Sequence, residues 1–239
     1  MAVHYRTQGF LLKKTDLRET DQLFTIYTKD FGKLEILGKA IRKIKSKLRS
    51  GAELFYLSET EFIQGKTHKT LTDAITIEKF KNTRNDLERL KIAYQIAGVA
   101  DNLIKGQEKD ETIFNLLNET FDKLNNLQLT TCNLQLIYFY FIWNLLSILG
   151  YQIDLYNCAF CQKKLVPEKL FFEPEEGIIC SKCFEGAGDK EISPEVIKIL
   201  RLFQKNDWDT LLKLKIDNIY WKSLETISEN YLANYSKSE

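Results

Sequence analysis

In the first 80 residues, apolar and polar positions alternate with a period of two over several short runs. These runs cover residues 6–13, 22–28, 33–37, 53–63 and 71–77, and turn-forming residues at 29–32 and 64–66 separate some of them. A period of two is typical of strands that bury one face. No segment here is long enough for the crossover helix that a parallel sheet needs, so we predict a small closed barrel of five mainly antiparallel strands.

From Asp86 onward the apolar positions follow the period of a helix. The first predicted inner face comprises Leu87, Leu90, Tyr94, Ala97, Leu103 and Ile104, and the second comprises Ile113, Leu117, Phe121 and Leu124. The tail over 216–235 has the same spacing through Ile219, Leu224, Ile227 and Tyr231. We therefore predict an α+β protein with a β-barrel domain over 1–80 and an α-helical domain over 81–239.

Two signals mark helix ends in the second domain. Ser193 before Pro194 is a favourable N-cap and first-turn pair, which opens a helix with Ile197, Leu200 and Phe203 inside. Gly150 suits the C-cap of the apolar stretch 134–149, which we interpret as a helix buried on all sides. That stretch has polar interruptions and 16 residues, whereas a membrane span takes about 20. With no secretory signal at the start, we expect a cytoplasmic protein without membrane association.

Composition excludes several classes of protein. The 11 glycines and 3 prolines are too few for a collagen-like or linker-dominated chain, and 44% hydrophobic with 28% charged residues is typical of a globular protein. The formal net charge is +1, but it is unevenly distributed. Residues 1–80 hold 15 Lys and Arg against 10 Asp and Glu, while the rest holds 19 against 23. This asymmetry indicates an anionic partner for the first domain.

Four of the five cysteines lie in an irregular insert, which we predict at about 154–188. They form two Cys-x-x-Cys pairs: Cys158 with Cys161 and, after an interval of 18 residues, Cys180 with Cys183. This spacing lets four thiolates reach one tetrahedral ion at about 2.3 Å, and Zn²⁺ is the expected ion. Because four thiolates close its coordination shell, the site should be structural; an iron–sulfur cluster or two disulfides are the alternatives. Cys132 stands apart and is expected to be a small buried apolar residue.

The segment 39–49 is the most basic part of the chain. It contains Lys39, Arg42, Lys43, Lys45, Lys47 and Arg49 and no carboxylate. Since an unneutralised stretch of this kind repels itself, contact with nucleic-acid phosphates, without sequence preference, is the functional interpretation, and a solvated loop is the alternative. Lys33 is a further candidate. The aromatic residues Phe24, Tyr27, Phe31, Phe55 and Tyr56 would either stack on unpaired bases or fill the barrel core.

Material for catalysis is scarce. The chain has only two histidines, His4 and His68, and no His-Glu-x-x-His motif. Gly65-Lys66-Thr67 resembles the end of a phosphate-binding loop, but it lacks the first glycine and lies between predicted strands. The acidic cluster Glu173, Glu175 and Glu176 would suit a metal-dependent nuclease, but it lies within the cysteine insert and is better explained as a solvated loop.

Several motifs, in order along the whole chain, resemble the RecO family of bacterial recombination mediators. In the barrel they are residues 5–12, 19–21, 28–33, 45–47 and 62–66. Leu146 to Tyr151 continues the match, as does Phe172-Glu173-Pro174-Glu175-Glu176-Gly177 leading into Cys180. The resemblance implies an oligonucleotide/oligosaccharide-binding (OB) barrel of five strands, followed by a helical domain with a zinc-binding insert of four cysteines. Some members lack the cysteines, which agrees with a structural metal.

The resemblance also implies a function and its partners. It implies a non-enzymatic protein that binds single- and double-stranded DNA, anneals complementary strands, and assists RecA loading on DNA coated by single-stranded-DNA-binding protein (SSB), usually with RecR. By position, the run from Lys39 to Arg49 would be part of the DNA-contacting surface. An acidic, apolar-ended peptide such as the SSB tail would suit a groove between the helices. We expect a nucleoid-associated location. The competing hypotheses are a zinc-dependent nuclease and a zinc-containing protein-interaction module.

Overall fold

The structure, a computed structural model, describes residues 3–17, 19–127, 131–186 and 191–236, without the side chains of 131–133. The chain forms two compact units, Met1–Ile137 and Tyr138–Glu239. The first contains a β-barrel and three helices that follow it, and the second contains a small sheet, further helices and the cysteine pairs. The helix α4 (Thr131–Leu146) runs from the first unit into the second.

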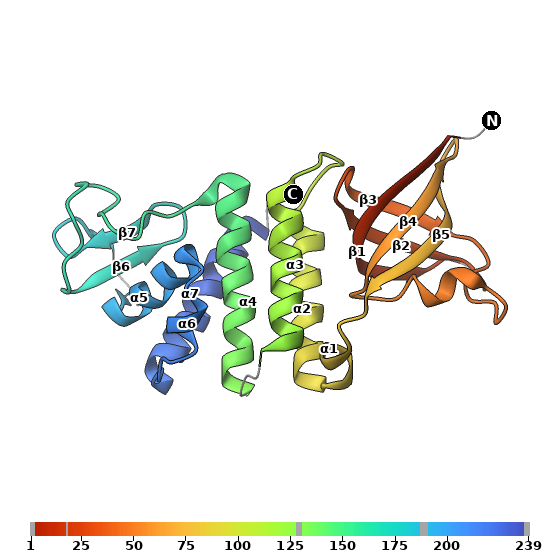
Figure 1. Ribbon diagram of the computed structural model, residues 1–239. Coiled ribbons are helices and arrows are strands. Elements are labelled where there is room, and N and C mark those ends of the chain that lie inside the picture. The colour runs from red at the N-terminus through yellow and green to blue at the C-terminus, as the bar shows by residue number, and fades with distance from the viewer. Residues whose placement is uncertain (1–2, 18, 128–130, 187–190, 237–239) are drawn as a thin grey trace. The chain divides into compact units, whose positions relative to one another are not determined.

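The barrel is closed and has the five predicted strands (Figure 1). They are β1 (His4–Asp16), β2 (Gln22–Thr28), β3 (Gly32–Gly38), β4 (Leu57–Gln64) and β5 (Lys69–Glu78), in the order β1-β2-β3-β5-β4. All pairs are antiparallel except β3 with β5, which is parallel over two residue pairs. The α+β class and the mainly antiparallel barrel are therefore confirmed, although β4 begins four residues later than predicted.

Strand β1 is buried on both sides, which explains its run of apolar residues. Leu11 lies in the barrel core with Phe24 and Ile26. Phe10 instead lies against two rings of α3 (Glu111–Asn126), with ring centroids 5.4 Å from Phe114 and 5.5 Å from Phe121. Burying such rings is worth about 1.5–3 kcal/mol each, so this aromatic contact fixes the barrel against α3.

Two of the helices that follow the barrel have side-chain N-caps. Asp86 accepts hydrogen bonds from the first-turn amides of α2 (Leu87–Leu103), and Asp110 does so for α3; the short α1 (Lys81–Asn85) precedes them. The predicted inner face of α3 is confirmed, because all four of its residues are buried. The predicted face of α2 is partly wrong: Leu87 is 82% exposed and Tyr94 is exposed too. Its buried side instead holds Ile92, Ile96 and Val99 together with Ala93, Ala97 and Ala100, whose small side chains let the helix approach β1 closely.

Helix α4 is buried on almost every side, as predicted. Its side chains from Leu136 to Trp143 are all buried. It ends in a π-helical turn, η2 (Ser147–Tyr151), where Gly150 has φ of 94°, in the left-handed region expected of a glycine cap. By length and composition Leu134–Tyr151 could cross a membrane, alone among the described helices, but 61% of it is buried inside the fold. A core helix meets the same criteria, and we interpret it as one.

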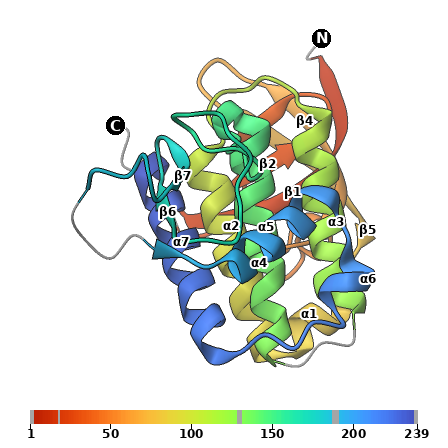
Figure 2. The ribbon, with the colours of Figure 1, turned by 90° about the vertical axis from the view of Figure 1, so that its left-hand side faces the viewer.

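In the second unit a three-stranded sheet of order β7-β6-β8 lies beside a C-terminal helix (Figure 2). The strands are β6 (Leu170–Glu173), β7 (Gly177–Cys180) and β8 (Glu191–Ile192), and the helices are α5 (Pro194–Lys205), α6 (Trp208–Leu211) and α7 (Asn218–Ser236). Phe172 of β6 packs edge-on against Tyr231 of α7 at 6.0 Å between centroids.

The predicted start of α5 is confirmed, because the Ser193 hydroxyl accepts from the Val196 amide and Pro194 follows it. Within α7, Leu224, Ile227 and Tyr231 are buried as predicted, whereas Ile219 is 77% exposed because it lies in the first turn, ahead of the buried stripe. The side chain of Cys132 and the end of the predicted insert at 187–188 lie outside the described residues.

Candidate nucleic-acid interface and thiol cluster

The basic segment 39–49, here called the basic loop, connects β3 to β4 and is held at both ends. At its start, the Ala40 amide donates to the Asp21 carboxylate at 2.7 Å, and the Arg42 amide donates to the Thr20 carbonyl at 3.1 Å. At its end, the short 3-10 helix η1 (Lys47–Ser50) leads into β4 along the barrel, in orange in Figure 1. The path of the loop is therefore set by the strands on either side of it.

Apolar residues of the loop reach the barrel core. Ile41 is buried among the core side chains and Leu48 packs against them. Beyond the loop, Gly51 lies so close to β5 that an added Cβ would be 1.9 Å from the Ala74 carbonyl oxygen. The Ser58 hydroxyl of β4 donates to the Gly51 carbonyl at 2.7 Å. These anchors leave the loop's charged side chains as its outer surface.

All six predicted cations of the basic loop are exposed. Arg42 pairs with Asp16 of β1 at 3.2 Å, a carboxylate that the local sequence did not reveal. In the described part of the chain, Lys39, Lys43, Lys45, Lys47 and Arg49 make no ion pair. Between Lys43 and Lys45 stands Ile44, which is 94% exposed and was not noticed in the sequence. The loop thus combines unpaired positive charge with one apolar tip.

Lys33 has a different environment from the loop. Its side chain is only 17% exposed, and its amino group donates to the Asp101 carbonyl at 2.5 Å and lies 3.6 Å from the Asp101 carboxylate. Asp101 also binds Lys13 of β1 at 2.9 Å. These contacts tie β1 and β3 to α2, so the Lys33 charge is already neutralised within the first unit.

The outer face of β2 and β3, where OB barrels commonly bind oligonucleotides, is partly covered. The buried Tyr27 hydroxyl donates to the Asp110 carbonyl at 3.0 Å, and burial raises the pKa of Tyr27 to about 12. What remains is a polar cleft of about 330 Å³ lined by charges of both signs, among them Glu35, Lys69 and Asp101. This face therefore lacks the surplus of positive charge that the basic loop has.

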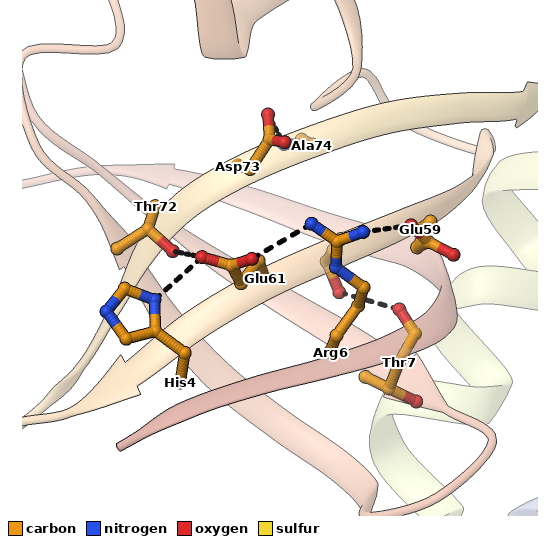
Figure 3. A network of polar contacts seen from close by, with 9 residues as sticks. His4, Arg6, Thr7, Glu59, Glu61, Thr72, Asp73 and Ala74 are labelled. Carbon is orange, nitrogen blue, oxygen red and sulfur yellow. Dashed lines mark hydrogen bonds and ion pairs between the residues drawn. The ribbon is translucent and has the colours of Figure 1, made fainter. Parts of the chain in front are cut away.

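Strands β1, β4 and β5 present another neutralised face (Figure 3). Arg6 bridges Glu59 at 3.2 Å and Glu61 at 3.0 Å, and Glu61 also accepts from His4 at 2.7 Å and from Thr72 at 3.0 Å. Hydrogen bonds from His4, Arg6 and Thr72 lower the pKa of Glu61 to about 2. Since every cation here already faces a carboxylate, this surface is a poor one for phosphate.

The four predicted cysteines come together. The sulfur atoms of Cys158, Cys161, Cys180 and Cys183, here called the thiol cluster, all lie within 4.8 Å of one another. Two tight turns bring this about: the Gln162 amide donates to the Cys158 carbonyl, and the Cys183 amide donates to the Cys180 carbonyl, both at 3.0 Å. Such a set could hold one metal ion.

The chemistry of these donors fits a cation. Burial by itself would raise the pKa of Cys158, but amide hydrogen bonds from Cys180, Cys161 and Phe160 outweigh it and lower that pKa to about 6. Hydrogen bonding with the thiols of Cys180 and Cys161 raises the pKa of Cys183 to about 12. Four thiolates therefore coexist here only when a cation compensates their charge, as a structural metal does.

The aromatic residues considered for base stacking are mostly core. Phe24, Tyr27 and Phe55 are fully buried, and only Phe31 and Tyr56 are partly accessible. Phe31 packs edge-on against Tyr5 and Phe62. The barrel therefore offers charge at the basic loop rather than a platform of exposed rings.

The chain combines an OB-type barrel that has an exposed basic loop with helices and a four-cysteine cluster. These features define a class of protein that has an oligonucleotide-binding fold and a cysteine cluster able to hold a metal ion. Residues 1–80 match the family described as Recombination protein O N terminal, and residues 84–238 match Recombination protein O C terminal. The chain belongs to the RecO family, and with it to the proteins of DNA repair and recombination. The resemblance seen in the sequence is confirmed.

Relatives named DNA repair protein RecO cover almost the whole chain. The protein from Dehalococcoides mccartyi (strain ATCC BAA-2266 / KCTC 15142 / 195) is 33% identical over 92% of this chain and 86% of its own length. That from Moorella thermoacetica is 30% identical over 97% of this chain and 86% of its own, and that from Thermoanaerobacter sp. (strain X514) is 26% identical over 98% and 93%. The similarity therefore extends through both units.

Proposed function

We propose that this chain is a non-enzymatic recombination mediator that binds single- and double-stranded DNA and anneals complementary strands. The exposed basic loop carries this proposal, because five of its cations make no ion pair among the described residues, whereas Arg6 and Lys33 on two other barrel faces are paired with carboxylates. Lysines that contact phosphates release condensed counterions, which supplies affinity without sequence preference. Family membership in DNA repair supports the same conclusion.

Annealing follows from the same charge. Two strands repel each other through their phosphates, and a cationic surface that holds both reduces this repulsion while base pairing provides the free energy. The proposed contact residues are Lys39, Arg42, Lys43, Lys45, Lys47 and Arg49; Lys33, being held by Asp101, is assigned to the barrel–helix contact instead. No covalent step is required, so no catalytic residue is assigned.

We propose Zn²⁺ as the ion of the thiol cluster, held by Cys158, Cys161, Cys180 and Cys183. Four thiolates complete a tetrahedral shell and leave no place for water, so the metal would stabilise the insert and would not activate a nucleophile. This argues against the zinc-dependent nuclease. A second candidate function for the cysteine insert is a zinc-containing protein-interaction module, which is favoured by the 56% exposed Phe160 between Cys158 and Cys161.

Partners of the family are proposals for this chain. A groove of about 440 Å³ in the second unit is lined by apolar residues that include Leu202 and Ile216, by four cations, and by one carboxylate, Glu195; the cations are Lys198, Arg201, Lys205 and Lys215. This chemistry suits an acidic peptide with an apolar end, such as the SSB tail. We propose that the chain acts on SSB-coated DNA with RecR and thereby assists RecA, in the bacterial cytoplasm at the nucleoid.

One annealing assay tests this proposal against its competitors. Complementary labelled oligonucleotides are mixed with the wild-type chain, with the loop variant K43E/K45E/K47E, or with the control K79E/K81E/K91E, which changes the net charge equally at exposed lysines elsewhere. We expect the wild type and the control to accelerate annealing and the loop variant to lose most of the acceleration. Equal annealing rates for the two variants would refute the assignment of the basic loop as the DNA-binding surface. Metal-dependent cleavage of the strands would favour the nuclease hypothesis.

A further inference from the structure

A second groove, here called the acidic groove, lies beside the thiol cluster in the second unit. Its volume is about 550 Å³, and its lining includes Phe160, Phe184 and Cys183. Phe160 is 56% exposed although it stands between two cluster residues, Cys158 and Cys161. Together, Phe160 and the half-buried Phe184 give this groove aromatic surface that an apolar side chain of another protein can cover.

The charge of this groove is negative. Glu173, Glu176 and Glu185 line it, against one cation, Lys182. The proposed metal centre adds to the negative charge, because Zn²⁺ with four thiolates has a formal charge of −2. The groove therefore selects an occupant that has positive charge around an apolar side chain.

The basic loop has that chemistry. Ile44 is the most exposed large hydrophobic residue in the described part of the chain, and the exposed side chains of Lys43 and Lys45 flank it. Phosphate binding gives no reason for an isoleucine there, since phosphates attract only the lysines. An apolar anchor between two cations is, however, what a pocket with a ring floor and carboxylates at its rim recognises.

We propose that the acidic groove receives the Lys43-Ile44-Lys45 tip of the basic loop from a second copy of this chain. The contact buries Ile44 against Phe160 and Phe184 and places the lysines near Glu176 and Glu185. Because the same lysines are those assigned to phosphate under the proposed function, self-association and DNA binding exclude each other. A small contact of this kind is weak, so DNA displaces it readily.

Complementation between two defective copies tests the contact with the full-length chain, by sedimentation velocity at low salt. The loop variant K43E/K45E keeps an intact groove, and the groove variant E176K/E185K keeps an intact loop. We expect each alone to associate at least tenfold more weakly than the wild type and their mixture to recover association. The proposal is wrong if every sample is monomeric, including the wild type at high concentration. It is also wrong if each variant alone associates as strongly as the wild type.

Ile44→Ser separates this inference from the proposed function, because it leaves every charge in place. We expect this variant to lose self-association at least tenfold while its affinity for an oligonucleotide, measured at a protein concentration where the chain is monomeric, changes less than twofold. In wild type, a 16-nucleotide single strand should dissociate the self-associated form. If self-association persists in the presence of saturating oligonucleotide, DNA binding and self-association do not compete and the proposal is wrong. A failure of the chain to bind DNA at all would refute the proposed function and not this contact.

Discussion

The basic loop and the segment 156–169, which holds the first cysteine pair of the thiol cluster, are both largely irregular, but they are stabilised in opposite ways. The basic loop uses the barrel core, into which it inserts Ile41 and packs Leu48. Between Leu155 and Leu170, by contrast, the one buried side chain is Cys158. A segment with a hydrophobic core beneath it can expose charge freely, whereas a segment without one requires another source of stability, and we propose that the thiol cluster with its metal is that source.

Among the substitutions that test this comparison, the loss of one cluster thiol should have the largest effect on stability. Cys180→Ser removes one ligand, and the free energy of metal binding is at the same time folding free energy for a segment without its own core. We expect bound metal to fall from about one ion per chain to nearly none, and the free energy of unfolding to fall by about 3 kcal/mol or more. Elemental analysis and denaturant titration measure the two quantities.

Cys132→Ser is the control for that variant, since Cys132 lies outside the two Cys-x-x-Cys pairs. It should keep the metal. If Cys180→Ser retains both its metal and its stability, the thiol cluster does not hold the segment together, and the contrast with the basic loop fails.

The close approach of Gly51 to β5 tests the other half of the contrast. Gly51→Ala forces a Cβ into the Ala74 carbonyl, which displaces the end of the loop from the barrel and should cost about 1–3 kcal/mol. The same substitution at Gly98 in α2 meets no atom within 4 Å and should stabilise the chain by about 0.5–1 kcal/mol. Chemical denaturation compares the pair, and a neutral Gly51→Ala would mean that the barrel does not anchor the loop.

Lys33 and Lys45 distinguish a structural lysine from one that serves binding. Lys33→Gln breaks the contacts with Asp101 and should cost about 1–2 kcal/mol of stability while leaving the salt dependence of DNA binding unchanged. Lys45→Gln should leave stability within about 0.5 kcal/mol and reduce the salt slope by about 0.7. Fluorescence anisotropy measures the salt slope of DNA binding and denaturant titration measures the stability of both variants. A reduced salt slope for Lys33→Gln together with an unchanged slope for Lys45→Gln would mean that Lys33 contacts DNA and Lys45 does not.

The smallest effect is expected at Glu61. Because hydrogen bonds lower its pKa from the ordinary 4.5 to about 2, the network in Figure 3 stabilises the folded barrel above pH 4.5 and loses this contribution as the pH falls towards 2. Glu61→Gln should therefore lose less stability than wild type between pH 5 and pH 2.5, as followed by urea midpoints. Parallel curves for the two proteins would show that the network contributes nothing.

Much of the fold could be predicted from the sequence because local signals there agree with the tertiary structure. The five strands, the cap at Ser193 and the buried stripe of α3 are examples. Prediction failed in part in α2, where spacing chose Leu87 and Tyr94, although the buried side includes Ile92, Ile96 and Val99 as well as three alanines. Apolar residues lie on more than one side of α2, so the local spacing does not decide which side is buried; packing against β1 and α3 decides it.

The candidate sites show the same division. The clustering of the four thiols could be predicted from the spacing of the cysteines, because two residues between the members of each pair set the turn geometry. The ion pair from Arg42 to Asp16 and the burial of Lys33 against Asp101 could not be predicted, since each joins residues that are far apart in the sequence. The exposure of Ile44 was hidden for the same reason: only the barrel decides which apolar residue of the loop is inside.

The salt dependence of single-strand binding tests most directly whether the basic loop is the DNA-binding surface. If the loop and its surroundings contact about 4–6 phosphates, the logarithm of the binding constant should fall against the logarithm of the salt concentration with a slope of roughly −3 to −4. For K43E/K45E/K47E we predict a slope about 2 units shallower and weaker binding to every sequence. Equal slopes and equal affinities for this variant and the wild type would contradict the account.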